Sequence, residues 1–475
     1  MAVDESLAFA SIRDLGTRLR AGEFTAVELA EFFLARVERF GPPLNAVVTV
    51  TRELALKQAA QADADLKSGR DRGPLHGIPW GAKDLLATAG IPTSWGAAPL
   101  KDQMFDEDAT VVRRLREAGA VLVAKLAMVE IAGGLGYIQA NASFTGPGKN
   151  PWNPTAWSGG SSSGSGSAVG AGLVPFAIGS ETWGSIMTPA AYCGVTGLRP
   201  TYGRVSRHGA MALTWSLDKL GPMCRTAEDS GLVLAAIAGP DEADPSASTR
   251  PYAYPPTKAE ELRPPFRLAT LKDAAVMVQP EVRANFEAAL KVFEPHATFT
   301  EVELPALPAS AVSATIIDCE MAAAFEGLVR SGDIWDLTAP EDRIGVHAAL
   351  TIPARDYINA LRIRRLIQRA MDELLAPFDA LVVPTRAAAA TPLDTDFSTY
   401  HRNWNAPSVG GAENAAGIPA ISVPNGFGER GLPTGLQFVG RAFDENRLIA
   451  LARFYQEATD WHTKRPSLEG LAATK

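Results

Sequence analysis

The sequence predicts an α/β protein with a central mixed, mostly parallel β-sheet, covered by helices on both faces, and a smaller inserted lobe. Short apolar runs such as VLVA at residues 121–124 are typical of buried strands, and segments with helical periodicity separate them along the chain. The 475 residues, 46% hydrophobic and 21% charged, have the composition of a folded protein rather than a disordered one.

The elements are expected in the following order. A T-x-x-E pattern at Thr25 and Glu28 begins a helix that Gly41-Pro42-Pro43 should stop. The pattern then predicts a strand at 45–51, a helix at 52–67, a strand entering a loop within 73–86, and a helix, turn and strand within 109–126. Later elements are strand, helix and strand at 266–271, 280–293 and 298–304, strands near 380, 422 and 438, and a closing helix at 444–457.

The prolines indicate how the chain is organised. Seven of them lie between Pro240 and Pro265, which is typical of a long surface connection. We therefore expect an N-terminal helical region at 1–70, a core at 71–239, the proline-rich connection with a smaller α/β lobe at 240–377, and a return to the main sheet at 378–475.

The charge and the cysteine content exclude several classes of protein. A net charge of −8 without a Lys/Arg-rich run argues against a nucleic-acid partner. Three widely spaced cysteines favour a reducing compartment, and Asp4 and Glu5 stand where a signal peptide has basic residues. The most apolar stretch, 168–179, is shorter than the ~20 residues that a membrane span needs. We expect a cytoplasmic protein without a membrane segment, a metal or a cofactor.

The segment WSGGSSSGSGSAVGAGL, residues 157–173, has three possible interpretations. A flexible linker would need a complete domain on each side, which the flanking segments do not resemble. The G-x-S-x-G of a nucleophile elbow (160–164) and the frayed dinucleotide fingerprint at 164–170 both lack the strand that must precede them. The third interpretation is a backbone that approaches a substrate closely, and it depends on motifs elsewhere in the chain.

These motifs occur in order over nearly the whole chain. GIPWGAKD, NPW followed by GGSS, CGVTGLRPTYGRVS, and GIPAISVP with LPTGLQFVG together resemble the amidase signature family of serine hydrolases. The resemblance implies the family's fold and a Ser-cisSer-Lys triad. Lys83 takes the place of the family's lysine, Ser161 that of the serine with the cis peptide bond, and Ser185, 24 positions later, that of the nucleophile.

The chemistry explains why these residue types are needed. A serine hydroxyl requires an adjacent base, and a lysine can serve if burial lowers its pKa from ~10.4 towards ~7–8. On the family model, Ser161 relays the proton from Ser185 to Lys83. The backbone N–H groups of Thr182, Trp183, Gly184 and Ser185 are then the natural donors to the oxyanion. The product of the first step is a Ser185 acyl-enzyme.

The nucleophile segment departs from the family pattern. It reads SETWGSIM at 180–187, so Trp183 replaces a glycine and Met187 replaces a residue that is often basic. We expect a stand-alone hydrolase, monomeric or homodimeric, of small neutral amides with an apolar or aromatic group, with Trp183 and Met187 as pocket walls. Carbamate or ester cleavage stays open.

Two other functions remain open. GLRPTYGRVSRHG closely resembles the glutaminase subunit of the tRNA-dependent amidotransferase, which supplies ammonia to partner subunits. The chain is alternatively an inactive binding protein on an amidase scaffold, although the presence of all three triad residues argues against this.

Overall fold

The computed structural model describes residues 5–258, 261–404 and 406–471; Asp4 lies outside them. In these residues one eleven-stranded sheet has the order β1-β3-β2-β4-β6-β5-β10-β11-β9-β7-β8. The strands are β1 (Val47–Val50), β2 (Pro79–Lys83), β3 (Val121–Leu126), β4 (Phe176–Glu181), β5 (Thr196–Arg199), β6 (Lys219–Cys224), β7 (Phe266–Leu271), β8 (Ala297–Val302), β9 (Ala380–Pro384), β10 (Ala420–Phe427) and β11 (Pro433–Val439).

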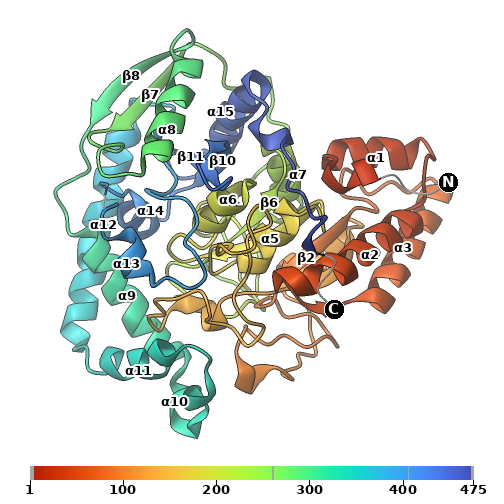
Figure 1. Ribbon diagram of the computed structural model, residues 1–475, viewed down its shortest axis with the longest axis horizontal. Helices are drawn as coiled ribbons and strands as arrows, with labels where there is room; N and C mark the ends of the chain where they lie inside the picture. Colours follow the sequence, from red (N-terminus) through yellow and green to blue (C-terminus); the bar gives the residue numbers. More distant parts are fainter. Residues whose placement is uncertain (1–4, 259–260, 405, 472–475) are drawn as a thin grey trace.

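Fifteen α-helices surround this sheet in the described residues (Figure 1). They are α1 (Ile12–Arg20), α2 (Ala26–Leu44), α3 (Arg52–Lys67), α4 (Thr110–Glu117), α5 (Ser163–Gly170), α6 (Met187–Cys193), α7 (Ala227–Ile237), α8 (Pro280–Phe293), α9 (Ala309–Ala324), α10 (Glu326–Ser331), α11 (Pro340–Ala349), α12 (Ala354–Leu375), α13 (Phe397–His401), α14 (Gly410–Ala416) and α15 (Glu445–Ala458).

The helices cover both faces of the sheet, as expected. Consecutive residues of a strand point to opposite faces, and two neighbours on β11 make this visible. The hydroxyl of Thr434 accepts a hydrogen bond from Asn285 of α8 at 2.9 Å. At the next position a Cβ on Gly435 would lie 2.9 Å from Ala191 of α6. Therefore α8 and α6 lie on opposite faces.

The expected parallel majority is wrong. Of the ten strand pairings in the described residues, four are parallel (β2 with β3 and β4, β7 with β8 and β9) and six are antiparallel. Apolar strands of the kind that predicted parallel pairing arise here because helices bury both faces, and burial makes a strand apolar whatever its direction.

The strands expected in a smaller lobe instead extend the main sheet. β7 pairs with β9, and β8 pairs with β7, so the strand–helix–strand unit of β7, α8 and β8 forms the outer edge of the sheet. Figure 1 shows this unit at the end of the molecule opposite the N-terminal helices α1–α3. The division of the chain at residues 240 and 377 stays a prediction.

The first long helix continues through the prolines that were expected to stop it. Helix α2 includes Pro42 and Pro43 and ends at Leu44, and Asn45 caps it in the left-handed conformation (φ 50°). Prolines in a last turn forgo their amide hydrogen bonds, but Leu44 is fully buried. Burying a leucine side chain contributes about 1.5–3 kcal/mol, which offsets much of that loss.

The Gly/Ser segment is buried along its length, its residues 163–170 form helix α5, and it is not a linker. Every residue of α5 is buried, and the helix contacts β2, β3, β4 and α6. A Cβ on Gly166 would lie 3.0 Å from the Pro189 carbonyl oxygen of α6, and one on Gly170 would lie 2.9 Å from that of Cys193. The glycines are therefore needed because two helix backbones approach each other closely.

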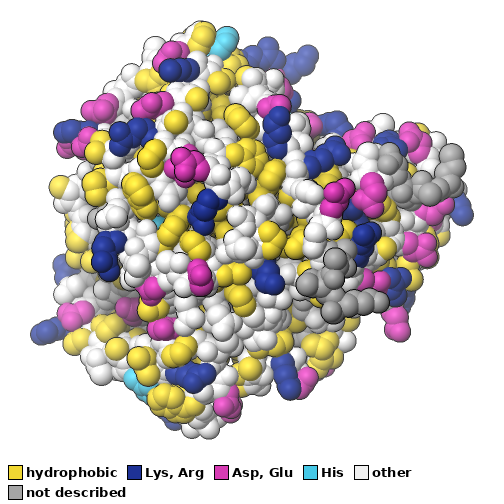
Figure 2. Space-filling view, viewed as in Figure 1, with side chains coloured by type: hydrophobic (Ala, Val, Ile, Leu, Met, Phe, Trp, Pro, Cys, Tyr) yellow, Lys and Arg dark blue, Asp and Glu magenta, His cyan; other side chains and the backbone are white. Residues whose placement is uncertain are grey.

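In the described residues, no helix is both long and apolar enough to span a bilayer. On the face seen in Figure 2, acidic and basic side chains are interspersed. Charges of both signs side by side keep the local field weak, in line with the modest net charge of −8.

The close packing of α5 makes a prediction about stability. A Cβ on Gly164 would press on the backbone of Ala46 and Ala127, 2.5 Å from the Ala127 nitrogen, so Gly164→Ala should destabilise the protein by about 1–3 kcal/mol or more. Gly327 in α10 has nothing within 4 Å of its Cβ position, and Gly327→Ala is the matched control. Urea denaturation should show that only Gly164→Ala lowers the midpoint; equal midpoints would contradict the packing argument.

Candidate active site

Lys83 is the last residue of β2, which lies between the parallel strands β3 and β4 in the middle of one half of the sheet. Its side chain is fully buried. The Nζ atom is 2.7 Å from Ser161 Oγ and 2.8 Å from Ser180 Oγ, and it donates to both hydroxyls. Ser180 comes from β4, next to β2, so the strand pairing brings it to the lysine.

The environment of Lys83 favours the neutral amine. Burial lowers the pKa of Lys83 to about 7, although the negative charges of Asp218 and Glu181 act in the opposite direction. The adjacent Asp84 does not neutralise it, because the Asp84 carboxylate forms an ion pair with Lys125 of β3 at 3.1 Å. Asp84 lies in the turn that follows β2, and this turn directs its carboxylate to Lys125 and to the Ser94 N–H at 2.9 Å.

Ser161 is held on a tight backbone segment before α5. The Gly160–Ser161 peptide bond is cis, as the resemblance implies, and Gly159 has a φ of +86°. A side chain at Gly159 would also meet the backbone of Pro189, so this position requires glycine. The next residue, Ser162, donates its N–H to the Ser185 carbonyl oxygen at 3.3 Å. The segments that carry Ser161 and Ser185 are therefore in contact.

Ser185 lies in the turn between β4 and α6, half-buried. Glu181, at the end of β4, accepts the N–H groups of Ile186 at 2.8 Å and Met187 at 3.0 Å. In the described part of the chain, the hydrogen bonds of this turn use neither the Trp183 N–H, the Gly184 N–H nor the Ser185 N–H as a donor. These three amides remain available to a bound group.

A buried ion-pair network holds the turn between β4 and α6 in place. Arg199 of β5 lies 2.7 Å from Glu181 and 2.9 Å from Glu413 of α14, and all three side chains are buried. Burial alone would raise the pKa of Glu181, but the charges of Arg199 and Lys219 hold it below its usual value. These charges favour the ionised form of Glu181, which accepts the Ile186 and Met187 amides.

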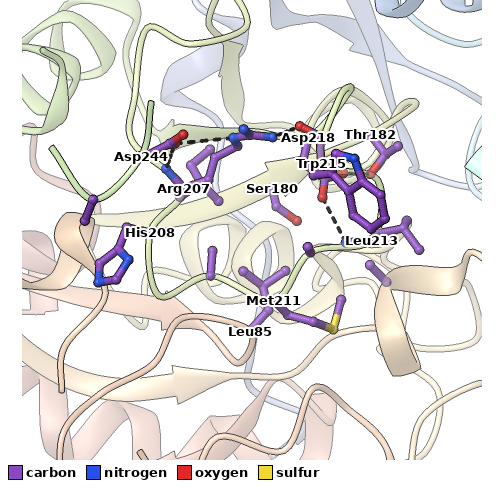
Figure 3. A pocket seen from close by; sticks show the side chains of 15 residues that line it. Leu85, Ser180, Thr182, Arg207, His208, Met211, Leu213, Trp215, Asp218 and Asp244 are labelled. Atoms are coloured by element: carbon purple, nitrogen blue, oxygen red, sulfur yellow. Dashed lines mark hydrogen bonds and ion pairs between the residues drawn. The ribbon is translucent and has the colours of Figure 1, made fainter. Parts of the chain in front are cut away.

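Thr182 is restrained on the other side of the turn. Its hydroxyl donates to Asp218 at 2.5 Å, and the second Asp218 oxygen accepts the N–H groups of Leu213 and Thr214, each at 2.9 Å. Figure 3 shows Asp218 and Thr182 at one end of a cavity of about 200 Å³, with Ser180 between them and Arg207. Thr182 and Leu213 also line the cavity that contains Ser185.

Ser185 opens into a cavity of about 380 Å³ that is lined in part by aromatic rings. Trp157 stacks on Phe397 with ring centroids 4.5 Å apart, and Tyr137 packs edge-on against both rings. A second cavity of about 210 Å³ lies on the other side of Trp183. Trp183, which is 37% exposed, lines both cavities, whereas the buried Met187 lines only the second.

The structure thus joins Lys83 directly to Ser161 and places the Ser185 segment beside Ser161. Three features were not predicted from the sequence: Ser180, the Arg199–Glu181–Glu413 network and Asp218. Nothing local in the sequence distinguishes Ser180 from the other serines around it. In the described residues, no group of three His, Cys, Asp or Glu side chains is arranged to hold a metal ion.

The family model described as Amidase matches residues 28–449. The chain belongs to the amidase family. Its match to the glutamyl-tRNA(Gln) amidotransferase A subunit of Methylococcus capsulatus is 39% identical and covers 96% of this chain and 98% of the relative. The corresponding protein of Chromohalobacter salexigens is 40% identical over 96% of this chain and 98% of the relative.

The fold is also that of solved amidase signature structures. The peptide amidase of Stenotrophomonas maltophilia superposes with a TM-score of 0.83 at 34% identity, covering 94% of this chain and 96% of that one. The proteins similar to this chain therefore include both a peptide amidase and amidotransferase subunits.

The ion-pair network makes a second prediction. Arg199→Met leaves Glu181 and Glu413 buried without their cation and should destabilise the protein by about 3–5 kcal/mol at neutral pH. The loss should shrink in mildly acidic buffer, because unpaired buried carboxylates take up protons there.

The control is Arg20→Met, which breaks a partly exposed ion pair with Asp71 and should cost at most about 1 kcal/mol. Urea denaturation at the two pH values measures both variants. Equal losses for the two substitutions would mean that Arg199 does not stabilise the turn.

Proposed function

We propose that this protein hydrolyses the C–N bond of an amide through a Ser185 acyl-enzyme. The observation that supports this best is the 2.7 Å contact between the fully buried Lys83 amine and the Ser161 hydroxyl, on a segment in contact with that of Ser185. A neutral amine has one lone pair and two N–H groups. In the structure the amine donates to both hydroxyls; to act as the base it turns its lone pair towards Ser161 and accepts that proton, while an N–H group still donates to Ser180.

In the first step the Ser185 oxygen bonds to the amide carbon, its proton passes to Ser161, and the Ser161 proton passes to Lys83. The tetrahedral intermediate then collapses: the C–N bond breaks, and the leaving nitrogen takes a proton from Ser161, which Lys83 replenishes. Water attacks the acyl-enzyme by the same relay, so that the carboxylic acid leaves and Ser185 regains its proton. Each half-reaction restores the neutral lysine.

The oxyanion would be stabilised by backbone N–H groups of the β4–α6 turn. Trp183, Gly184 and Ser185 have amides that the protein leaves unused, and preorganised donors of this kind are worth about 3–4 kcal/mol each. Thr182, the fourth donor expected from the sequence, precedes them and is restrained by Asp218. The Trp183 side chain does not remove an amide, so its substitution for glycine leaves this role possible.

The walls of the two cavities favour amides with an apolar or aromatic group. Trp183 and Met187 contribute to these walls, together with Trp157 and Phe397. Carbamates and esters would react by the same steps, since both present a carbonyl carbon with a leaving group.

A second candidate is the glutaminase component of an amidotransferase, working with partner subunits. The 39–40% identity to curated proteins of this kind over nearly the whole chain favours it. The two candidates differ in two measurable properties: whether free glutamine is the preferred amide, and whether partner proteins raise the rate of its hydrolysis.

The nucleophile can be tested directly. Wild-type protein should react with a fluorophosphonate and hydrolyse at least one member of a panel of aliphatic amides, anilides, carbamates and glutamine. Ser185→Ala should lose labelling and reduce turnover by roughly 10³-fold or more. Ser167→Ala, a buried serine of α5 that donates to the Lys149 carbonyl oxygen, is the control and should keep both. Unchanged activity in Ser185→Ala would assign the nucleophile elsewhere.

The lowered pKa of Lys83 predicts how kcat/KM depends on pH. Because burial lowers the pKa of Lys83 to about 7 and the neutral amine is the active form, kcat/KM should rise with pH through about 7 and then level off. Lys83→Met should lower kcat/KM by about 10²–10⁴-fold.

A control is needed because burial also lowers the pKa of Lys219 to about 7. Lys219→Gln should retain the acidic limb of the profile. If the limb disappears in Lys219→Gln and persists in a residually active Lys83 variant, the base has been misassigned.

A further inference from the structure

Arg386 stands where the two cavities meet. It follows β9 by two residues, and its side chain lines both cavities together with Trp183, Thr188 and His401. A group bound beside Ser185 and extending past Trp183 would therefore reach this guanidinium. The side chain is exposed rather than packed into the core, so it remains accessible to a ligand.

The positive charge of Arg386 has no carboxylate partner among the residues that the structure describes. Across the described part of the chain it takes part in no ion pair, and its positive charge acts on the nearby Tyr192 hydroxyl, where burial outweighs it. Among the described residues that line either cavity, the one carboxylate is Glu413. Arg199 at 2.9 Å and Gln437 at 2.8 Å already occupy its oxygens.

The other titratable groups around Arg386 are neutral. Burial, with the positive charge of Arg386 as a second cause, lowers the pKa of His401 to about 4. Burial raises the pKa values of Tyr137 and Tyr192 above their usual range. At neutral pH the Ser185 cavity thus presents one positive charge, and no anion among its described lining residues opposes it.

The side chains around Arg386 make its positive charge selective for an anionic ligand. Tyr137, Trp157 and Phe397 place aromatic rings along one side of the cavity. An ion pair is stronger in such surroundings than in bulk water, and the planar guanidinium can bind both oxygens of a carboxylate.

We infer that Arg386 binds a carboxylate of the substrate, and that the enzyme acts on amides that carry a carboxylate but no ammonium group. This inference rests on the proposed function and narrows its substrate class. It departs from the neutral amides expected from the sequence. It also disfavours free glutamine, because the α-ammonium of glutamine would enter a positively charged cavity without finding a carboxylate.

Three amides of similar length separate these charges: glutaramate carries a carboxylate, glutamine a carboxylate and an ammonium, and valeramide neither. We expect kcat/KM to be highest for glutaramate. Two aromatic pairs locate the carboxylate, 4-carbamoylbenzoate against 4-methylbenzamide on the acyl side, and 4-acetamidobenzoate against 4-acetamidotoluene on the amine side. A preference for the carboxylate in one pair identifies the side that Arg386 faces; no preference in any pair overturns the inference.

The residue itself is tested by Arg386→Gln, which keeps a polar donor near Tyr192 but removes the charge. This substitution should lower kcat/KM for the preferred carboxylate substrate roughly 10- to 100-fold, chiefly through KM. It should change kcat/KM for the neutral substrate of the same pair less than about twofold. Arg386→Lys should recover part of the loss. Arg369→Gln, an exposed arginine of α12 outside both cavities, should leave both substrates unchanged. An equal loss for both substrates in Arg386→Gln would mean a structural role only.

Binding to Ser185→Ala separates the failure of this inference from the failure of the proposed function. Calorimetry should find that the carboxylate of the preferred pair binds more tightly than its neutral partner, and that Arg386→Gln in the same background removes the difference. If this difference is absent while wild-type protein still hydrolyses neutral amides, the inference is wrong and the proposed function stands. If the difference is present but no amide is hydrolysed, Arg386 binds carboxylates and the proposed function is wrong.

Discussion

The site depends on burying one amine without giving it a carboxylate in contact. Lys83 touches the hydroxyls of Ser161 and Ser180, while the anions that influence it, Asp218 and Glu181, are engaged by other groups. Lys125, one strand away and equally buried, has Asp84 at 3.1 Å. The two buried lysines thus differ in their partners: Lys125 has a carboxylate, and Lys83 has two hydroxyls. Burial lowers the pKa of both lysines, but Asp84 acts to raise that of Lys125, whereas Lys83, among hydroxyls, has a pKa of about 7 and gives up its proton near neutral pH.

The close helix packing serves this arrangement. Because α5 has glycines where it meets α6, the Ser161 segment at the start of α5 and the Ser185 turn before α6 are drawn together. Glu181 then fixes the turn by accepting the Ile186 and Met187 amides. The Trp183, Gly184 and Ser185 amides are left without an acceptor among the described residues. The Arg199–Glu181–Glu413 ion pairs therefore hold the β4–α6 turn in one conformation and leave its remaining amides available to a ligand.

Much of this could be predicted from the sequence, because it is encoded locally. The helices at 52–67 and 280–293 and the strand at 266–271 have the predicted bounds. Strand direction, the continuation of α2 through Pro42, and the joining of β7 and β8 to the main sheet depend on contacts between distant segments, which local periodicity does not report. The same holds for the site: the motifs indicated Lys83 and Ser161, but Ser180 became visible only once β2 and β4 were neighbours.

Arg386 bears on the choice of substrate rather than on the reaction. The residues around Ser185 that the motifs identify carry out a reaction common to any amide, so they hold little information about which amide is used. Specificity must reside in side chains that differ from the motifs and face the cavity, such as Trp183 and Arg386. An unpaired guanidinium beside aromatic walls costs desolvation when an apolar ligand covers it, and that cost is recovered only when the ligand carries an anion. The cavity therefore discriminates through the penalty it imposes on neutral and cationic ligands as much as through the attraction it offers to a carboxylate.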